Sequence, residues 1–237
     1  MLNVPRLFCV RSLLFCLLLT TLGTTAIAQT VSQNPALDRQ LSRIDLGVTA
    51  VAVLNKESNG TALVPGNPGS GSSGAAVSTP VNLSPGNTAG AVVTLRYVAS
   101  PLIGFELNYG YARYTDTFTP FGSNSTAGVQ QNASEYTLGY VAHTRKQYFG
   151  LTPFASAGLG SIVFRPTPGG GLALPEQARA AYYFSVGAET LVLSPHFGIR
   201  AQYRQVFFKA PDFETNYLTI QQHTSSAEPG FGFFLRF

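Results

Sequence analysis

The sequence predicts an all-β protein, an antiparallel eight-stranded up-and-down transmembrane β-barrel, from three observations. Apolar and polar residues alternate along successive segments, which is the period of a half-buried strand. Most of these segments are long enough for a tilted strand to cross a bilayer. Charged residues make up only 11% of the chain, against roughly 25% in an average soluble domain. A surface that largely contacts lipid explains this deficit, because lipid-facing positions do not need charge.

Residues 1–28 are expected to form a cleaved secretory signal peptide. Two arginines precede an apolar run at residues 13–22, and an Ala-x-Ala cleavage motif ends at Ala28. The apolar run is shorter than the roughly 18 residues that a spanning helix needs. Both cysteines, Cys9 and Cys16, lie in this segment. We therefore expect no disulfide and no thiolate metal site in the mature chain.

The mature chain divides into a polar periplasmic lead-in, residues 29–43, and a barrel domain, residues 44–237. Alternation of apolar and polar residues predicts eight strands in the barrel domain. These strands are residues 44–55, 89–99, 103–115, 129–143, 150–164, 178–192, 196–208 and 230–237.

The predicted connections alternate in length. The short ones are residues 100–102, 144–149 and 193–195. The long ones are residues 56–88, 116–128, 165–177 and 209–229. Bacterial outer-membrane barrels have short periplasmic turns and longer outward loops. We therefore expect a Gram-negative outer-membrane protein with both chain ends in the periplasm.

The polar face of the predicted strands carries few charges, and their signs balance. A membrane barrel turns this face toward its lumen, and an eight-stranded lumen is just wide enough to be filled by side chains. Buried charges in such a space must be paired and hydrogen-bonded. We predict a salt-bridged lumen network of Asp45, Arg96, Glu106, Glu135, Glu189, Arg200, Arg204 and Arg236. The alternative is that some of these charges sit uncoupled in wet vestibules at the two ends.

Aromatic residues near the strand ends are expected to form two interfacial girdles. The girdle residues are Tyr97, Phe197 and Phe237 at the turn side, and Tyr109, Tyr111, Tyr203 and Phe207 toward the loop side. Arg113 shares the parity of Tyr111, so we expect it to point outward and snorkel to lipid head groups. Glycines concentrate on the opposite, polar face, which favours a narrow and crowded lumen.

The C-terminal segment has the pattern Phe231-x-Phe233-x-Leu235-x-Phe237. With the signal peptide and the alternating strands, it resembles the small OmpA-like and OmpW-like outer-membrane barrels of the porin family. Three internal segments, residues 104–110, 153–160 and 199–204, are also similar to strands of that superfamily. The resemblance implies that Phe237, supported by Phe231, Phe233 and Leu235, is the signal for the outer-membrane assembly machinery. It implies little about activity, because such barrels share architecture more than function.

The sequence favours a structural or surface-interaction barrel with a plugged lumen. A narrow porin-like conduit for small or apolar solutes is the alternative, and a lipid-modifying enzyme is the third hypothesis. His223, Ser225 and Glu228 are the one grouping similar to the catalytic set of lipid A deacylase barrels, and their neighbours do not match that family. We therefore expect no enzymatic activity, no cofactor and no metal site.

The expected partners are outer-membrane lipid, lipopolysaccharide and the outer-membrane assembly machinery. Lysine and arginine do not cluster with interleaved aromatic residues, so nucleic-acid binding is not expected. The residues of the long loops do not specify a surface ligand.

Overall fold

The computed structural model describes residues 39–64, 77–120, 126–215, 218, 220 and 222–237 of the 237-residue chain. The predicted signal peptide and most of the predicted lead-in lie outside the described residues. The chain divides into two compact units, of which the first ends at Arg43 and the second is Ile44–Phe237. All the strands belong to the second unit.

The described part of this unit consists of strands and their connections. The strands are β1 (Ile44–Asn55), β2 (Ser58–Val64), β3 (Val77–Pro85), β4 (Thr88–Tyr97), β5 (Ile103–Pro120), β6 (Ala127–His143), β7 (Thr152–Pro166), β8 (Gln177–Ser194), β9 (Phe197–Lys209) and β10 (His223–Arg236). Among the described residues, no helix has both the length and the apolar character needed to cross a membrane.

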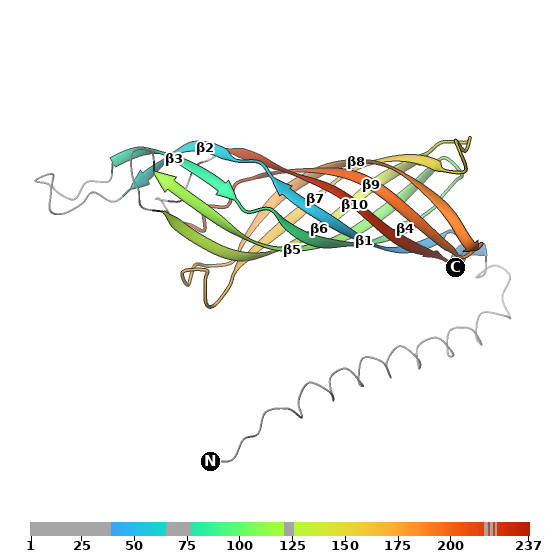
Figure 1. The fold of residues 1–237 in the computed structure, drawn as a ribbon, viewed down its shortest axis with the longest axis horizontal. Helices are drawn as coiled ribbons and strands as arrows, with labels where there is room; N and C mark the ends of the chain where they lie inside the picture. Colours follow the sequence, from blue (N-terminus) through green and yellow to red (C-terminus); the bar gives the residue numbers. More distant parts are fainter. Residues whose placement is uncertain (1–38, 65–76, 121–125, 216–217, 219, 221) are drawn as a thin grey trace, which may run out of the picture. The chain divides into compact units, whose positions relative to one another are not determined.

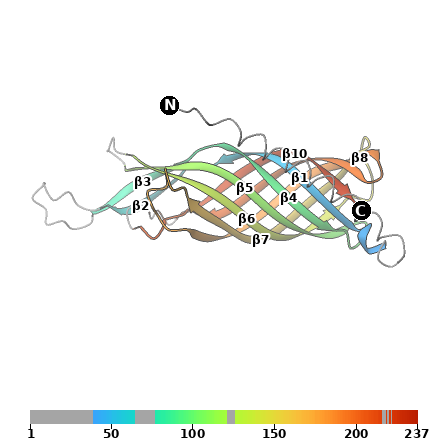
Figure 2. The same cartoon turned by 90° about the horizontal axis from the view of Figure 1, so that it is seen from below.

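Eight of the strands, β1 and β4 to β10, form a closed antiparallel barrel in which neighbours in sequence are neighbours in space (Figure 1). β1 pairs with both β4 and β10, and β5 pairs with β6, which completes the circle. Closure satisfies the backbone hydrogen bonds that an open sheet edge would leave unmade. Figure 2 shows the strands winding around one barrel. The predicted fold class is confirmed.

The short connections and the two ends of the barrel unit lie at one end of the barrel, called here the turn end. Ile44 pairs with Tyr97 at this end, and Asp45 pairs with both Arg96 and Arg236. The strand ends that the long connections join lie at the opposite end, called the loop end. This arrangement follows from the alternating connection lengths in the sequence.

The strands β2 and β3 form a hairpin within residues 56–88, which the sequence prediction treats as a loop. β5 continues to Pro120 beyond the predicted end at Thr115, and its added length pairs with β3 from Val81 to Pro85. The prediction missed this hairpin because its two strands flank a glycine- and proline-rich segment. The hairpin extends the barrel wall at the loop end.

The last strand, β10, begins at His223 and not at the predicted Gly230. Pro229 and the serines before it suggested a loop, yet His223 to Leu235 form a continuous ladder with β9. On its other side, the backbone of Pro229 lies beside β1. The ladder between β1 and β10 is interrupted there, between the pairs Val51–Gly230 and Leu54–Ala227. A proline is tolerated at such an interruption because it has no N–H to donate.

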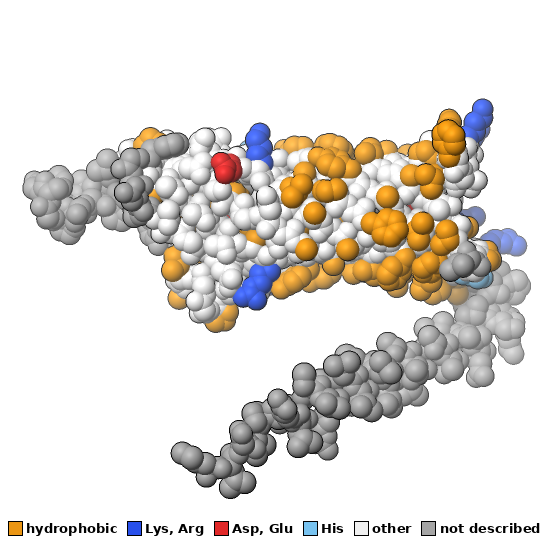
Figure 3. Space-filling view, in the orientation of Figure 1, with side chains coloured by type: hydrophobic (Ala, Val, Ile, Leu, Met, Phe, Trp, Pro, Cys, Tyr) orange, Lys and Arg blue, Asp and Glu red, His pale blue; other side chains and the backbone are white. Residues whose placement is uncertain are grey.

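The outer wall of the barrel is apolar, as the alternation predicts. On β1, Leu46, Val48 and Leu54 are exposed, whereas Asp45 and Thr49 are buried. Figure 3 shows hydrophobic side chains covering the wall as a belt that reaches the turn end and thins toward the loop end. An exposed apolar surface of this kind marks contact with lipid or with another protein.

The predicted girdle residues all lie on strands that form this wall or at its C-terminal end. Tyr109, Tyr111, Tyr203 and Phe237 are exposed, and Tyr97, Phe197 and Phe207 are half-buried. The predicted girdles do not include the exposed aromatic residues Phe105, Tyr136, Tyr140 and Tyr182, which also lie on the wall. Ring pairs occur between Phe105 and Tyr140, Tyr109 and Tyr136, and Tyr182 and Phe207.

The interior has two layers, although the sequence analysis assigned polar residues to the whole lumen. Polar and charged side chains occupy the half toward the turn end. Toward the loop end, most inward positions become apolar, as at Val51, Val53 and Phe208, and they join one hydrophobic cluster. Asp116 and Gln131 are buried polar exceptions in this half. Phe213, Leu218 and Ile220 of the β9–β10 connection are also buried in the hydrophobic cluster. The prediction failed here because apolar residues occupy both faces of these strand segments.

Candidate site inside the barrel

Most of the described interior charges form three groups of ion pairs, and the first is centred on Arg96. Asp116 belongs to none of these groups; it is buried and accepts a hydrogen bond from Gln131 Nε2 at 2.7 Å. The Arg96 guanidinium donates from Nε and Nη2 to Glu106 Oε2, at 3.2 and 2.9 Å, and from Nη1 to Glu189 Oε2 at 2.9 Å. The side chain of Arg96 is 1% exposed. Arg96 on β4 and Glu106 on β5 are register partners, so the pair forms directly across neighbouring strands.

Glu189 extends this first group to Arg200 and His143. Arg200 Nε donates to Glu189 Oε2 at 3.0 Å, and His143 Nε2 lies 3.4 Å from Glu189 Oε1. The ring of Phe154 lies near both arginines, with its centroid 4.8 Å from the Cζ atom of Arg96 and 5.4 Å from that of Arg200. The aromatic face favours both cations, which repel each other.

The second group joins Arg204 to two glutamates. Arg204 Nη1 donates to Glu135 Oε2 at 2.8 Å and to Glu228 Oε2 at 2.9 Å, and Nη2 donates to Glu135 Oε1. Arg204 also lies over the ring of Tyr183, with Cζ 4.4 Å from the centroid. One arginine therefore holds two carboxylates together in the middle of the barrel.

Tyr183 and Asn108 connect the first two groups. The Tyr183 hydroxyl donates to Glu106 Oε1 at 2.8 Å and accepts from Asn108 Nδ2 at 3.0 Å. A Cβ added at Gly139 would lie 2.3 Å from the Tyr183 hydroxyl, so only glycine leaves room for this side chain. The crowding of glycines on the inner face, noted in the sequence, has this packing role.

The third group is the pair of Asp45 and Arg236 at the turn end. Arg236 Nε and Nη2 donate to the two carboxylate oxygens of Asp45 at 2.8 and 2.9 Å. The Arg236 side chain is 32% exposed, unlike the other interior arginines. It borders a polar vestibule of about 260 Å³ that is also lined by Gln147, Thr152 and Glu189.

All eight residues of the predicted lumen network point inward, and each takes part in one of these groups. The sequence analysis missed Glu228, His143, Tyr183 and Asn108 as members. Glu228 was placed in a loop because Pro229 follows it. The inward parity of His143 and Tyr183 on their predicted strands was the available signal for those two residues.

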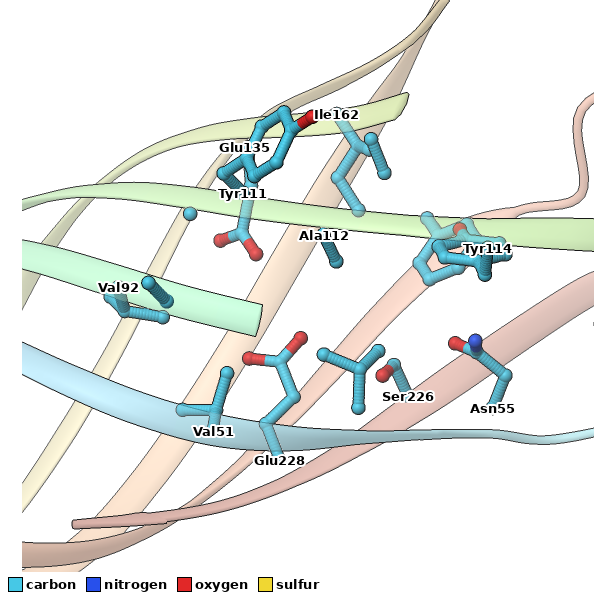
Figure 4. Close-up of a pocket in the computed structure, with 15 residues that line it drawn as sticks. Val51, Asn55, Val92, Tyr111, Ala112, Tyr114, Glu135, Ile162, Ser226 and Glu228 are labelled. Atoms are coloured by element: carbon cyan, nitrogen blue, oxygen red, sulfur yellow. The ribbon is translucent and has the colours of Figure 1, made fainter. Parts of the chain in front are cut away.

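The apolar half of the interior contains a cavity of about 40 Å³. Figure 4 shows the carboxylates of Glu135 and Glu228 pointing into it, from β6 and β10. Val51, Val92 and Ile162 supply apolar lining. A space of this size holds a few water molecules at most.

The grouping of His223, Ser225 and Glu228 does not assemble. His223 is exposed on the outer face of the first β10 residues, whereas Glu228 is buried inside and paired with Arg204. Among the described residues, no three His, Cys, Asp or Glu side chains come together in a way that could hold a metal ion.

A closed antiparallel barrel with an apolar outside and charged residues inside defines the class of transmembrane β-barrels. The comparisons with solved structures agree. The outer membrane protein OprG from Pseudomonas aeruginosa superposes with a TM-score of 0.53 at 12% identity, over 82% of this chain and 95% of OprG. Neisserial surface protein A superposes with a TM-score of 0.51 at 13% identity, over 82% of this chain and 97% of that protein. The fold is therefore that of small outer-membrane barrels.

No protein-family model matches the sequence. No curated protein matches it either.

Proposed function

We propose that this chain is an outer-membrane barrel whose lumen is closed to ions and polar solutes, and that it acts through its outer surface and loops. The turn end faces the periplasm in this proposal, and the loop end faces outward. The observation that carries the proposal is that ion-paired side chains occupy the interior toward the turn end and mainly apolar side chains occupy it toward the loop end.

The two interior layers would block passage in different ways. The arginines of the first two groups are 1–2% exposed, so water does not separate them from their carboxylates. Above them, an ion would have to enter the apolar cluster that includes Phe118, Phe164 and Phe213, where an unpaired charge is very costly. The Asp45–Arg236 pair, beside the vestibule, is the part of the network nearest to bulk water.

Planar-bilayer recording tests this proposal. The purified native chain is expected to give no steady conductance above the bare membrane. Replacing the interior phenylalanines Phe164 and Phe208 together by alanine removes part of the apolar layer and serves as the comparison. A large and steady conductance of the native chain would contradict the proposal.

A role without catalysis is part of the same proposal. The geometry of His223 and Glu228, on opposite faces of β10, supports it. Mass spectrometry of lipid A from cells with and without the protein is the corresponding test. A change in acyl chains that depends on the protein would overturn this part.

A conduit for small apolar solutes is the second candidate function. The cavity of about 40 Å³ favours it, because outward-facing Ala91 and Tyr111 contribute to the lining together with inward-facing Val92 and Ala112. An apolar solute could then exchange between the bilayer and the interior without crossing the ion pairs. Uptake of an alkane by cells expressing the protein, with no ion conductance, would favour this candidate over the first.

A further inference from the structure

We propose that Arg113 and Arg165 form a binding site for the phosphate of a phosphorylated glycolipid in the outer leaflet, on the lipid-facing wall of the barrel. The inference rests on the proposed membrane location and adds one specific partner to it. The site is called the Arg113–Arg165 patch and consists of Arg113, Gln130, Asn132 and Arg165.

The strand register brings the two arginines into one row. Arg113 on β5 is the partner of Asn132 on β6, and Asn132 is the partner of Arg165 on β7. Directly paired residues of antiparallel strands point to the same side of the sheet. The two arginines are two strand spacings apart, about 10 Å between their Cα atoms.

The patch faces outward at the edge of the apolar belt. Arg113 follows Tyr111 and Tyr109 on the same face of β5, and these tyrosines are 44% and 41% exposed. In Figure 3, Lys and Arg side chains lie at the loop-side edge of the hydrophobic belt. Tyrosine rings prefer the membrane interface. Arg113, two residues further along β5 toward the loop end, therefore lies at the depth of the lipid head groups.

Neighbouring polar groups hold the patch in place. Arg113 Nη2 donates to Gln130 Oε1 at 2.7 Å, and Arg165 Nη1 donates to Ser134 Oγ at 3.3 Å. Tyr111 donates its hydroxyl to Asn132 Oδ1 at 3.1 Å. Gln130 itself is fixed by Thr167, which donates from Oγ1 to Gln130 Oε1 at 3.0 Å. These partners are neutral, so they orient the arginines without cancelling their charge.

Among the described residues, Glu176 is the one carboxylate that contacts the patch. Glu176 Oε2 lies 2.6 Å from Arg165 Nε. The Glu176 side chain is 54% exposed and the Arg165 side chain is 44% exposed. Exposed ion pairs contribute little stability, so a lipid phosphate competes with Glu176 for Arg165. Charge-assisted, bidentate contact to phosphate is the geometry that arginine favours. The amides of Gln130 and Asn132 suit the hydroxyl groups of a sugar head group.

Native mass spectrometry of the folded barrel in detergent micelles, titrated with diphosphorylated lipid A, tests the proposal. Arg113→Gln/Arg165→Gln is expected to weaken binding about tenfold or more, from the loss of two charge-assisted contacts. The matched control, Arg145→Gln/Lys146→Gln, removes two exposed cations from a connection at the turn end and should leave binding unchanged. Glu176→Gln should strengthen binding, because it frees Arg165.

Three results would overturn the proposal. They are unchanged binding in Arg113→Gln/Arg165→Gln, an equal loss in the turn-end control, and binding of phosphatidylglycerol with the same affinity and the same dependence on the two arginines. The last result would assign the patch to any anionic phospholipid. The interior side chains are the same in all these variants, so a failure here would leave the conductance of the barrel, and the closed-lumen proposal, unaffected.

Discussion

At the scale of single residues, the interior of this barrel depends on arginines that each serve more than one carboxylate. Arg96 binds Glu106 and Glu189, and Arg204 binds Glu135 and Glu228. Taking such charges out of water is expensive, and their attraction offsets this cost only when the geometry is good and hydrogen bonds are complete. Removal of one central arginine therefore has a larger effect than removal of a surface charge.

Arg204→Met is expected to lower the free energy of unfolding by about 3–5 kcal/mol, because Glu135 and Glu228 would remain buried and unpaired. Urea titration of the barrel in lipid vesicles measures this. Arg145→Met, in an exposed connection, is the matched control and should change stability by less than about 0.5 kcal/mol. Equal effects of the two substitutions would show that the Arg204 group does not stabilise the fold.

The sequence predicted the inward direction of the eight network charges, because parity along a strand fixes the face of each side chain. It missed the inward Glu228 and Asp116, which it placed in connections. It could not predict the partners. Glu106–Arg96 follows from register between neighbouring strands, whereas Arg96 and Glu189 come from strands that are not adjacent in the barrel. That contact depends on the diameter of the closed barrel, which alternation does not specify.

At the scale of elements, the strands and the connections differ in how far the sequence defines them. The long alternating strands β1, β7 and β9 were predicted within two residues at either end. The hairpin of β2 and β3, and the first half of β10, were missed because Gly, Pro and Ser obscure the alternation there. These elements are specified by pairing with β5 and β9, which are distant contacts.

The last strand is expected to control assembly. Phe237→Glu should reduce the amount of barrel in the membrane fraction, because it places a charge at the end of the Phe231, Phe233, Leu235 row. The side chain of Phe237 is 45% exposed, so the substitution does not create an interior cavity. Phe149→Glu, at a fully exposed position in the β6–β7 connection, is the control. Normal assembly of the Phe237 variant would show that the row is not the signal.

Asp212 joins the β9–β10 connection to strand β8. It accepts a hydrogen bond from Gln177 Nε2 at 2.6 Å and forms an ion pair with Arg179 Nη2 at 2.6 Å. Partial burial raises the pKa of Asp212, but the hydrogen bonds from Gln177 and the Glu214 backbone, with Arg179, bring it below its usual range. Because the pKa of Asp212 is lower in the folded state, its ionised carboxylate stabilises the folded connection at pH values above the unfolded-state pKa of about 4. This stabilisation is lost as the pH falls through the folded-state pKa.

Asp212→Asn is therefore expected to speed hydrogen exchange at Phe213 and its neighbours at pH 7. The difference from the native chain should shrink as the pH falls below about 4, where Asp212 in the native chain becomes protonated. Hydrogen–deuterium exchange with mass spectrometry, corrected for the intrinsic rate at each pH, measures both effects. A difference that stays constant from pH 7 to acid would contradict the assignment.

At the scale of the whole molecule, the two ends of the barrel differ in their interior. Near the turn end the interior is charged, the inverse of a soluble protein, and near the loop end it is a hydrophobic core, as in a soluble protein. The outer wall is apolar along the belt, while the inside changes from ion pairs to a hydrophobic cluster. The low charge content of the sequence predicted the outer wall. It did not predict the second interior layer, because apolar residues on both faces leave no periodic signal to separate inside from outside.

Site-directed spin labelling in bilayers tests the central claim most directly, that the outer face contacts lipid and the inner face excludes water. Both native cysteines lie in the predicted signal peptide, so single cysteines can be introduced at outward Leu107 and Leu138 and at inward Val92 and Ala133. Labels at the outward positions should be accessible to oxygen and not to a water-soluble nickel complex, and labels at the inward positions should be inaccessible to both. Access of the nickel complex to the inward labels would contradict the account.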